Sequence, residues 1–291
     1  MFISVITPTY NRGYCIEKLY KSLCEQTNKN FEWIVIDDGS SDDTQKRVEE
    51  YRGKNNGFVV SYFYQENGGK HRALNSAIEK AQGDYCFIVD SDDILTGDAI
   101  ETIYLWLEDV NDLSHFAGVA GKRGGMNGET LGEFPDADVI DATNIERIRK
   151  HLCGDKAEVY ATTLLRKYPF PEFEGEKFLR EDAVWDLIAH NGYKIRWHKK
   201  VIYKCEYLED GLTKNSKDII LNNFQGYTYV QKNKMNFYSF PYNWLSLVVY
   251  MYYAEIKGME EKDILEAFEI SQLRYCIAKI LLKFWKKRKK L

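Results

Sequence analysis

Apolar positions in the first 110 residues follow two alternating patterns. Four short runs are almost continuously apolar, as expected for strands buried on both faces; they cover residues 2–7, 31–37, 58–65 and 85–90. Apolar residues recur at helical spacing over residues 15–26, 44–51, 72–82 and 99–108. This alternation predicts an α/β fold, a mostly parallel sheet flanked by helices, which binds ligands at the carboxyl ends of its strands.

The pattern changes after residue 110. Residues 118–132 contain six glycines and few apolar residues, which predicts a mobile loop near the site. A mixed segment follows to about residue 207 and includes a predicted helix over residues 181–191. From residue 216 helical spacing predicts two or three helices. We therefore expect one unit over residues 1–213 and a C-terminal helical extension over residues 214–291.

Composition narrows the class of protein. The chain has 291 residues, of which 44% are apolar and 29% charged, as in a globular protein of one or two domains. The longest apolar run, residues 244–254, is shorter than the roughly 20 residues that span a bilayer, and we expect no signal peptide. Six scattered cysteines, without a Cys-x-x-Cys pair, indicate reduced thiols in a cytoplasmic protein.

Charge is unevenly distributed along the chain. The formal charge is −4, but residues 270–291 hold eight basic and no acidic residues, which leaves −12 on the first 269 residues. Such an acidic body disfavours nucleic acid as a partner.

The basic end also has apolar residues at helical spacing. It fits either a helix drawn to an anionic membrane surface or the solvated end of a packed helix. An aromatic stretch over residues 237–253 fits the same surface or a contact between copies of the chain in a homo-oligomer. The apolar side of the basic helix is expected to contain Ile277, Ile280, Leu281, Phe284 and Trp285.

Three polar clusters follow three of the predicted strands. They are residues 7–12 (TPTYNR), 37–42 (DDGSSD) and 90–93 (DSDD). Carboxylates at positions i and i+2 can converge on Mg²⁺ or Mn²⁺, with substrate phosphates completing the coordination shell. Each cluster alone also fits a turn or a helix cap. Three clusters at one edge of a sheet favour a binding site.

A fourth polar segment, residues 66–72 (ENGGKHR), follows a strand and opens a helix. Gly68 and Gly69 allow a ligand to approach the backbone, and a helix N-terminus beside Lys70 and Arg72 favours phosphate. A helix-capping turn would look similar. The segment is neither a G-x-G-x-x-G motif nor a P-loop, which argues against a dehydrogenase or a P-loop ATPase.

Together, the ordered segments SVITPTYNR, VIDDGSSDDT, ENGGKHRALN and GDYCFIVDSDD resemble an inverting nucleotide-sugar glycosyltransferase of family 2, with the GT-A fold. The resemblance covers residues 2–110 strongly and 155–215 more weakly. It implies a nucleotide-binding half over residues 1–110 and an acceptor half over residues 111–213. It also implies a UDP-sugar donor and a glycan acceptor, lipid-linked if the basic helix meets a membrane, in bacterial cell-surface polysaccharide synthesis.

The resemblance further implies roles for individual residues. Pro8 and Tyr10 would line the base, and Asp38 would read its imide edge beside Asp37. Asp90-Ser91-Asp92 matches the D-x-D motif, so Asp92 would bind Mn²⁺ or Mg²⁺ and Asp90 the ribose or the metal. The other expected contacts to the nucleotide are Thr9, Asn11, Arg12, Gly68, Lys70, Arg72 and Ser91. Further candidates at this end of the site are His71 and Asp93.

The family also has a general base on its acceptor side. Glu181-Asp182 matches its E-D motif, so Asp182 is expected to take the proton of the acceptor hydroxyl as this attacks C1 of the sugar. The metal would stabilise charge on the departing diphosphate. The two acids could also merely complement a helix dipole. Many relatives place a histidine after the next strand; residues 204–213 have none, and Glu206 is a substitute candidate.

Two other functions remain open. A nucleotidyltransferase shares the alternating sheet, but residues 8–11 do not resemble its glycine-rich basic loop. A noncatalytic module that binds sugar nucleotides or glycans could also keep this fold. Intact Asp92 and Asp182 argue against such a module.

Overall fold

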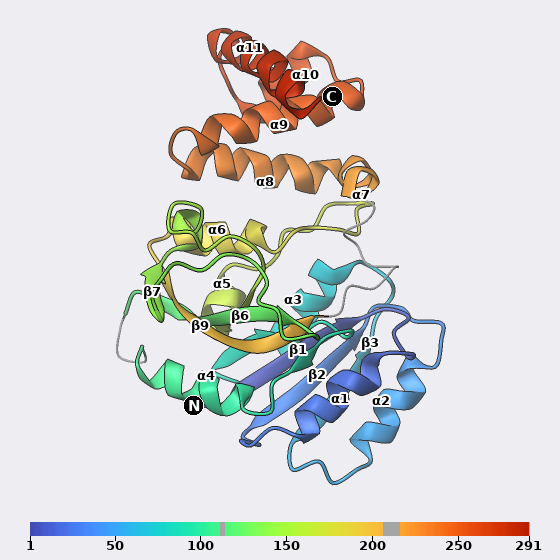
Figure 1. The fold of residues 1–291 in the computed structure, drawn as a ribbon. Helices are drawn as coiled ribbons and strands as arrows, with labels where there is room; N and C mark the ends of the chain where they lie inside the picture. Colours follow the sequence, from blue (N-terminus) through green and yellow to red (C-terminus); the bar gives the residue numbers. More distant parts are fainter. Residues whose placement is uncertain (111–113, 206–215, 291) are drawn as a thin grey trace.

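The computed structural model describes residues 1–110, 114–205 and 216–290, and it contains one mixed sheet in the order β3-β2-β1-β4-β8-β6-β9-β5, with β7 beside β9 (Figure 1). The parallel part consists of β1 (Ile3–Thr9), β2 (Phe31–Asp37), β3 (Val59–Tyr64) and β4 (Tyr85–Ile88). Its helices are α1 (Ile16–Cys24), α2 (Thr44–Arg52), α3 (Lys70–Lys80) and α4 (Ala99–Glu108). These eight elements confirm the sequence prediction.

Alternate residues of the central strands enter two different cores. On β1, Val5 packs in the core that contains Leu19 of α1, whereas Ile6 packs in the core that contains Leu74 of α3. Because both faces of the sheet are covered, the strands are almost wholly apolar and their polar residues lie at the ends.

The rest of the sheet lies on the other side of β4. β8 (Lys156–Ala161) runs antiparallel to both β4 and β6 (Phe116–Gly125), and β6 is parallel to β9 (Lys194–Cys205). The remaining elements here are β5 (Ile94–Leu95), β7 (Val139–Ala142), the short 3₁₀ helix η1 (Asn144–Glu146), α5 (Thr162–Lys167) and α6 (Asp182–His190). The helix predicted over residues 181–191 is therefore confirmed.

The loop predicted over residues 118–132 is wrong for its first half. Residues 118–125 belong to β6, which is almost entirely buried between β8 and β9. A Cβ on Gly118 would lie 1.9 Å from the carbonyl oxygen of Val159 on β8. This glycine therefore permits close approach of two strands, and it does not mark a flexible segment.

Residues 216–290 form five helices where the sequence predicted two or three. They are α7 (Ser216–Asn222), α8 (Phe224–Phe237), α9 (Tyr242–Ile256), α10 (Glu261–Phe268) and α11 (Gln272–Lys289). Breaks between them are short: Glu269 ends α10 in the left-handed conformation, and the Ser271 side chain caps α11 two residues later. Apolar spacing continues across such breaks, so the pattern alone merges neighbouring helices.

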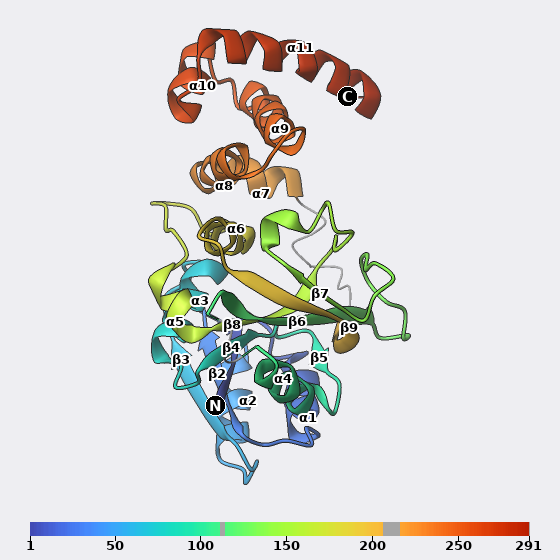
Figure 2. The ribbon, with the colours of Figure 1, turned by 90° about the vertical axis from the view of Figure 1, so that its left-hand side faces the viewer.

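The C-terminal helices have a core of their own, which includes the buried Tyr250 and Phe268. α8 packs against α6, α9 against α8, and α11 against α9, so α11 lies at the end of the molecule farthest from β3 (Figures 1 and 2). Within the described ranges, no helix combines the length and the apolar character needed to cross a bilayer.

Candidate functional site

One lysine joins the end of β4 to the start of α6. Nζ of Lys70 lies 2.6 Å from Oδ1 of Asp90 and 2.8 Å from Oε1 of Glu181. Lys70 is the first residue of α3, Asp90 follows β4, and Glu181 precedes α6. Residues expected on the donor side and on the acceptor side are therefore in direct contact.

Two residues that the sequence analysis missed complete this group. The hydroxyl of Tyr203 on β9 donates to Oδ2 of Asp93 over 2.8 Å and accepts the backbone N–H of Asp90 over 2.9 Å. The guanidinium of Arg123 on β6 lies 4.2 Å from the Tyr203 ring centroid and within 3.7 Å of Oδ2 of Asp90. We call Lys70, Asp90, Asp93, Arg123, Glu181 and Tyr203 the Asp90 cluster.

Charge is partly balanced within the cluster. Burial raises the pKa of Asp90, but the charges of Lys70 and Arg123 outweigh it, so this pKa lies below its ordinary value. Burial and the charge of Asp90 raise the pKa of Asp93 to about 7. The same two causes raise the pKa of Asp92, on which the charge of Arg12 has the opposite effect. Arg12 and Asp92 thus interact electrostatically.

The acidic residues after β4 fit a cation that is shared with a ligand. Burial and a neighbouring carboxylate disfavour the ionised form of Asp92, and a divalent cation would relieve both effects. Across the described ranges, no three His, Cys, Asp or Glu side chains come together as a metal site. Asp92 and Asp90 could therefore hold Mg²⁺ or Mn²⁺ only with further oxygen ligands, such as phosphates.

Asp38 holds the glycine turn in place. Its Oδ1 accepts the backbone N–H of Gly68 over 2.9 Å, and its Oδ2 accepts that of Gly69 over 2.7 Å. Gly69 has a φ of +97°, and a Cβ there would lie 1.9 Å from the carbonyl oxygen of Lys177. The turn is thus fixed between the Asp38 carboxylate and the backbone of Lys177. The expected contact of Asp38 with a base remains a prediction.

Hydrogen bonds also connect the loops that follow β1 and β2. Asn11, with a φ of +52°, accepts the backbone N–H of Ser41 on its Oδ1 over 2.8 Å. Asp37 accepts the backbone N–H of Ser40 and the hydroxyl of Tyr62, each over 2.7 Å. Tyr10 is 49% exposed, whereas three other predicted contacts are buried: Pro8 and Thr9 at the end of β1, and Ser91 after β4. The Tyr10 ring is therefore accessible to a ligand, whereas the Asp37 carboxylate is hydrogen-bonded within the protein.

Two further predicted site residues, His71 and Arg72, lie in the first turn of α3. Arg72 donates to the carbonyl oxygens of Gly68, Phe173 and Glu176 and pairs with Glu172. His71 is buried, and burial followed by the charge of Arg72 lowers its pKa, so the imidazole is neutral at pH 7. Nδ1 of His71 is buried without a hydrogen-bond partner among the described residues. The expected roles of His71 and Arg72 at the diphosphate remain predictions, and Glu206 lies outside the described residues.

Asp182 is the first residue of α6 and directly follows Glu181 of the Asp90 cluster. Its Oδ2 lies 3.0 Å from Nη2 of Arg180 and 2.6 Å from Nζ of Lys234 on α8. Burial raises the pKa of Asp182, but these two charges outweigh it and hold the pKa below its ordinary value. Its other oxygen, Oδ1, is buried and has no hydrogen-bond partner among the described residues. Asp182 is thus an ionised carboxylate with one unused acceptor.

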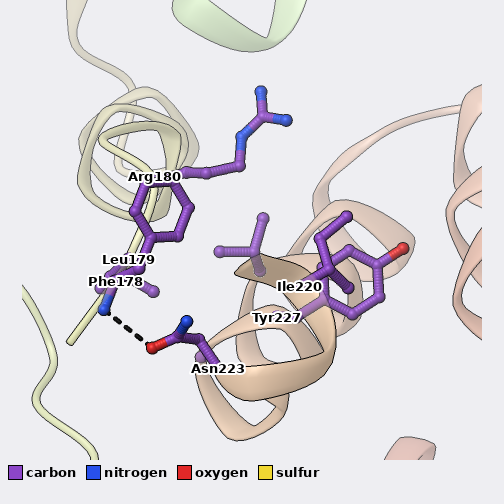
Figure 3. Close-up of a pocket in the computed structure, with 8 residues that line it drawn as sticks. Phe178, Leu179, Arg180, Ile220, Asn223 and Tyr227 are labelled. Atoms are coloured by element: carbon purple, nitrogen blue, oxygen red, sulfur yellow. Dashed lines mark hydrogen bonds between the residues drawn. The ribbon is translucent and has the colours of Figure 1, made fainter. Parts of the chain in front are cut away.

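A small pocket is lined in part by Arg180, one of the two cations paired with Asp182 (Figure 3). Its walls come from Phe178, Leu179 and Arg180 on one side and from α7 and α8 on the other. Asn223 closes one end by accepting the backbone N–H of Phe178 over 2.9 Å. The volume of about 40 Å³ suffices for only a few water molecules, so this pocket is not a sugar-nucleotide site.

The chain is similar in sequence to known bacterial glycosyltransferases. Poly(ribitol-phosphate) beta-N-acetylglucosaminyltransferase TarS of Staphylococcus aureus is 31% identical over 65% of this chain, which is 32% of its own length. The GalNAc(5)-diNAcBac-PP-undecaprenol beta-1,3-glucosyltransferase of Campylobacter jejuni is 27% identical over 75% of this chain and 71% of its own. The chain therefore aligns with only about a third of TarS.

Solved structures show the same fold. TarS residues 1–349 in complex with UDP-GlcNAc match 96% of this chain and 79% of their own length with a TM-score of 0.66 and 20% identity. A mannosyltransferase of Pyrobaculum calidifontis, in complex with GDP-Man and Mn²⁺, matches 95% of this chain and 73% of its own, with a TM-score of 0.56 and 17% identity. The expected GT-A fold is confirmed.

A family model settles the relationship. The model described as glycosyl transferase family 2 matches residues 4–169, which is more than half of the chain. That range contains all four polar segments that follow the strands of the parallel sheet. The chain belongs to glycosyl transferase family 2.

Proposed function

We propose that this protein transfers a sugar from a UDP-sugar to a glycan acceptor, with inversion at C1 and with a divalent metal ion. One observation carries the proposal: Lys70 bridges Asp90, which follows the D-x-D strand, and Glu181, the neighbour of the candidate base. This contact supports a site in which the segment proposed to bind the donor meets the segment proposed to bind the acceptor.

The donor would bind along the carboxyl ends of β1, β2 and β4. The exposed ring of Tyr10 is suited to stack on the base, with Asn11 and Arg12 beside it. Asp92 and Asp90 would hold Mg²⁺ or Mn²⁺ together with the diphosphate, and the cation would supply stabilisation of the leaving-group charge. Lys70 adds a positive charge at the N-terminus of α3, where a helix favours phosphate.

Asp182 would act as the general base. The charges of Lys234 and Arg180 keep its carboxylate ionised at neutral pH, and the unused Oδ1 is the atom that would accept the proton of the acceptor hydroxyl. The acceptor oxygen forms a bond to C1 as the bond from C1 to the UDP oxygen breaks. A single displacement of this kind inverts C1.

The acceptor is proposed to be a glycan of a bacterial cell surface. The names of the TarS and Campylobacter relatives include a poly(ribitol phosphate) and an undecaprenol-linked glycan, respectively. A lipid-linked acceptor would place the enzyme at the inner face of the cytoplasmic membrane. The free thiols of all six cysteines suit that reducing compartment.

Calorimetric titration with UDP, in the presence and absence of Mn²⁺, tests the donor site directly. We expect binding that depends on the metal and that Asp92→Ala abolishes. Glu49→Ala, on the exposed side of α2, is the matched control and should bind as the wild type does. Absence of UDP binding under all conditions would refute the donor assignment. Binding without transfer to any acceptor would instead favour a noncatalytic sugar-nucleotide module.

A further inference from the structure

The outer face of α11 is apolar and exposed. Leu273, Ile280 and Phe284 are 71%, 57% and 69% exposed, and Ile277 and Leu281 are each 40% exposed. Their spacing places all five on one side of the helix. We call these five residues the α11 stripe.

The opposite face of α11 packs against the protein. Tyr275, Ala278 and Leu282 are buried in the C-terminal core. Trp285, which the sequence analysis expected on the same side as Ile277 and Phe284, instead packs against Tyr252, with ring centroids 5.4 Å apart. The α11 stripe is therefore separate from the face by which this helix packs on the protein.

Basic residues accompany the stripe. Lys279, Lys283 and Lys287 are exposed and follow one another at intervals of four residues, so they form a row along α11. No acidic residue occurs in α11. Lys286 lies nearer the protein and pairs with Glu255 of α9.

The positive charge of α11 indicates which kind of partner binds the α11 stripe. Two copies of the chain meeting through their α11 stripes would bring two rows of lysines together with no acidic residue on either helix, which is unfavourable. A surface of anionic lipids presents the opposite charge and an apolar interior. Because the first 269 residues carry a formal charge of −12, such a surface would repel the rest of the molecule and attract this end.

We infer that α11 binds the surface of an anionic lipid bilayer, with the α11 stripe inserted between the lipids and Lys279, Lys283 and Lys287 at the headgroups. The helix lies in the plane of the surface because its other face stays packed on α9. Its position at the outer end of the molecule leaves the sheet free of the bilayer (Figure 2). This inference deepens the proposed function, since a lipid-linked acceptor requires an enzyme at the membrane.

Vesicle flotation of the full chain tests the inference without donor or acceptor. Vesicles of phosphatidylcholine with about 30% phosphatidylglycerol should carry the protein, whereas pure phosphatidylcholine should not. Ile280→Ser combined with Phe284→Ser should abolish binding. Lys283→Glu combined with Lys287→Glu should weaken binding more than about tenfold, because each lysine near an anionic surface contributes about fivefold. Exposed residues elsewhere supply the matched controls Leu105→Ser and Lys46→Glu, which should bind as the wild type does.

Three outcomes would overturn the inference. One is a wild-type protein that does not float with anionic vesicles, and another is equal binding by the Lys283→Glu/Lys287→Glu variant. The third is a change of oligomeric state in the Ile280→Ser/Phe284→Ser variant with unchanged vesicle binding, which would assign the stripe to a second copy. UDP titration of the same variants should be unaffected, so failure of lipid binding is distinguishable from failure of the donor site.

Discussion

Nζ of Lys234 lies 2.6 Å from Oδ2 of Asp182, so a residue of the C-terminal helices holds the candidate base. A second contact, from the Tyr238 hydroxyl to Oδ1 of Asp186 over 3.0 Å, joins the same two segments four residues further along each. The C-terminal helices therefore contribute to the charge of the candidate site as well as packing beside it.

Removing Lys234 should change the pH dependence of transfer. In Lys234→Met the pKa of Asp182 loses its main lowering charge, so it should rise. Since the base acts as the carboxylate, the acid limb of the kcat/KM profile should move to higher pH by about one pH unit. Lys234→Arg should restore the wild-type profile.

The matched control lies on the same helix. Lys232 pairs with Glu269 at 2.7 Å, away from Asp182, so Lys232→Met removes an ion pair of α8 without touching the candidate base. Its profile should equal that of the wild type. An unshifted acid limb in Lys234→Met would exclude Lys234 as a positioning residue.

The two acids of the E-D motif should respond differently to neutralisation. Asp182→Asn should lower kcat by about a hundredfold or more while UDP still binds, because only the base is lost. Glu181→Gln should weaken UDP binding, because Lys70 loses one of its two partners beside Asp90. Transfer kinetics and UDP calorimetry on both variants separate these effects. If Asp182→Asn kept full transfer activity and Glu181→Gln lost it, Glu181 and not Asp182 would be the general base.

Lys70 should also support the folded state. Lys70→Met leaves Asp90 and Glu181 without their shared cation, which should lower the free energy of unfolding by about 3 kcal/mol, because Lys70 is only 26% exposed. The loss should be larger at pH 8 than at pH 5, because Lys70 holds the pKa of buried Asp90 down and without it Asp90 can bind a proton at the lower pH. Urea unfolding at the two pH values measures both effects. Lys200→Met, which breaks a half-exposed pair with Asp98, should cost less than about 1 kcal/mol.

Local patterns predicted the parallel half of the fold well. Its strands are apolar on both faces, and such runs end at polar residues, so the positions of Asp38 and Asp90 followed from the pattern itself. The sequence analysis did not predict β6, because a segment rich in glycine is typical of a loop. In the structure, Gly118 instead allows the backbone of β8 to approach closely.

Contacts across the chain account for the rest of the site. No sequence motif indicates that Tyr203 bridges Asp90 and Asp93, since Tyr203 lies more than a hundred positions after both of them. Arg72 matched a phosphate-binding pattern, yet it donates to the carbonyl oxygens of Phe173 and Glu176, which lie more than a hundred positions further along the chain. Partners of this kind are set by tertiary packing, which local spacing does not encode.

His198 should make the protein sensitive to acid. It is buried on β9, stacks on Trp106 with centroids 4.0 Å apart, and its Nε2 has no hydrogen-bond partner among the described residues. Burial, followed by the charge of Arg196, lowers its pKa to about 4 from an ordinary value of 6.5. Between these two values the unfolded chain binds a proton that the folded protein does not, so the free energy of unfolding falls as the pH is lowered from 6.5 to 4.

The substitution His198→Phe should remove this contribution while keeping a ring against Trp106. Between pH 6.5 and pH 4 the free energy of unfolding should fall in both proteins. The fall should be smaller in the variant than in the wild type, by up to about 3 kcal/mol. Urea unfolding at steps between pH 7 and pH 4 measures the difference. His190→Phe, on the exposed end of α6, should follow the wild-type curve because that side chain remains in contact with water. Parallel curves for the wild type and His198→Phe would show that the imidazole is protonated in the folded protein, contrary to its burial.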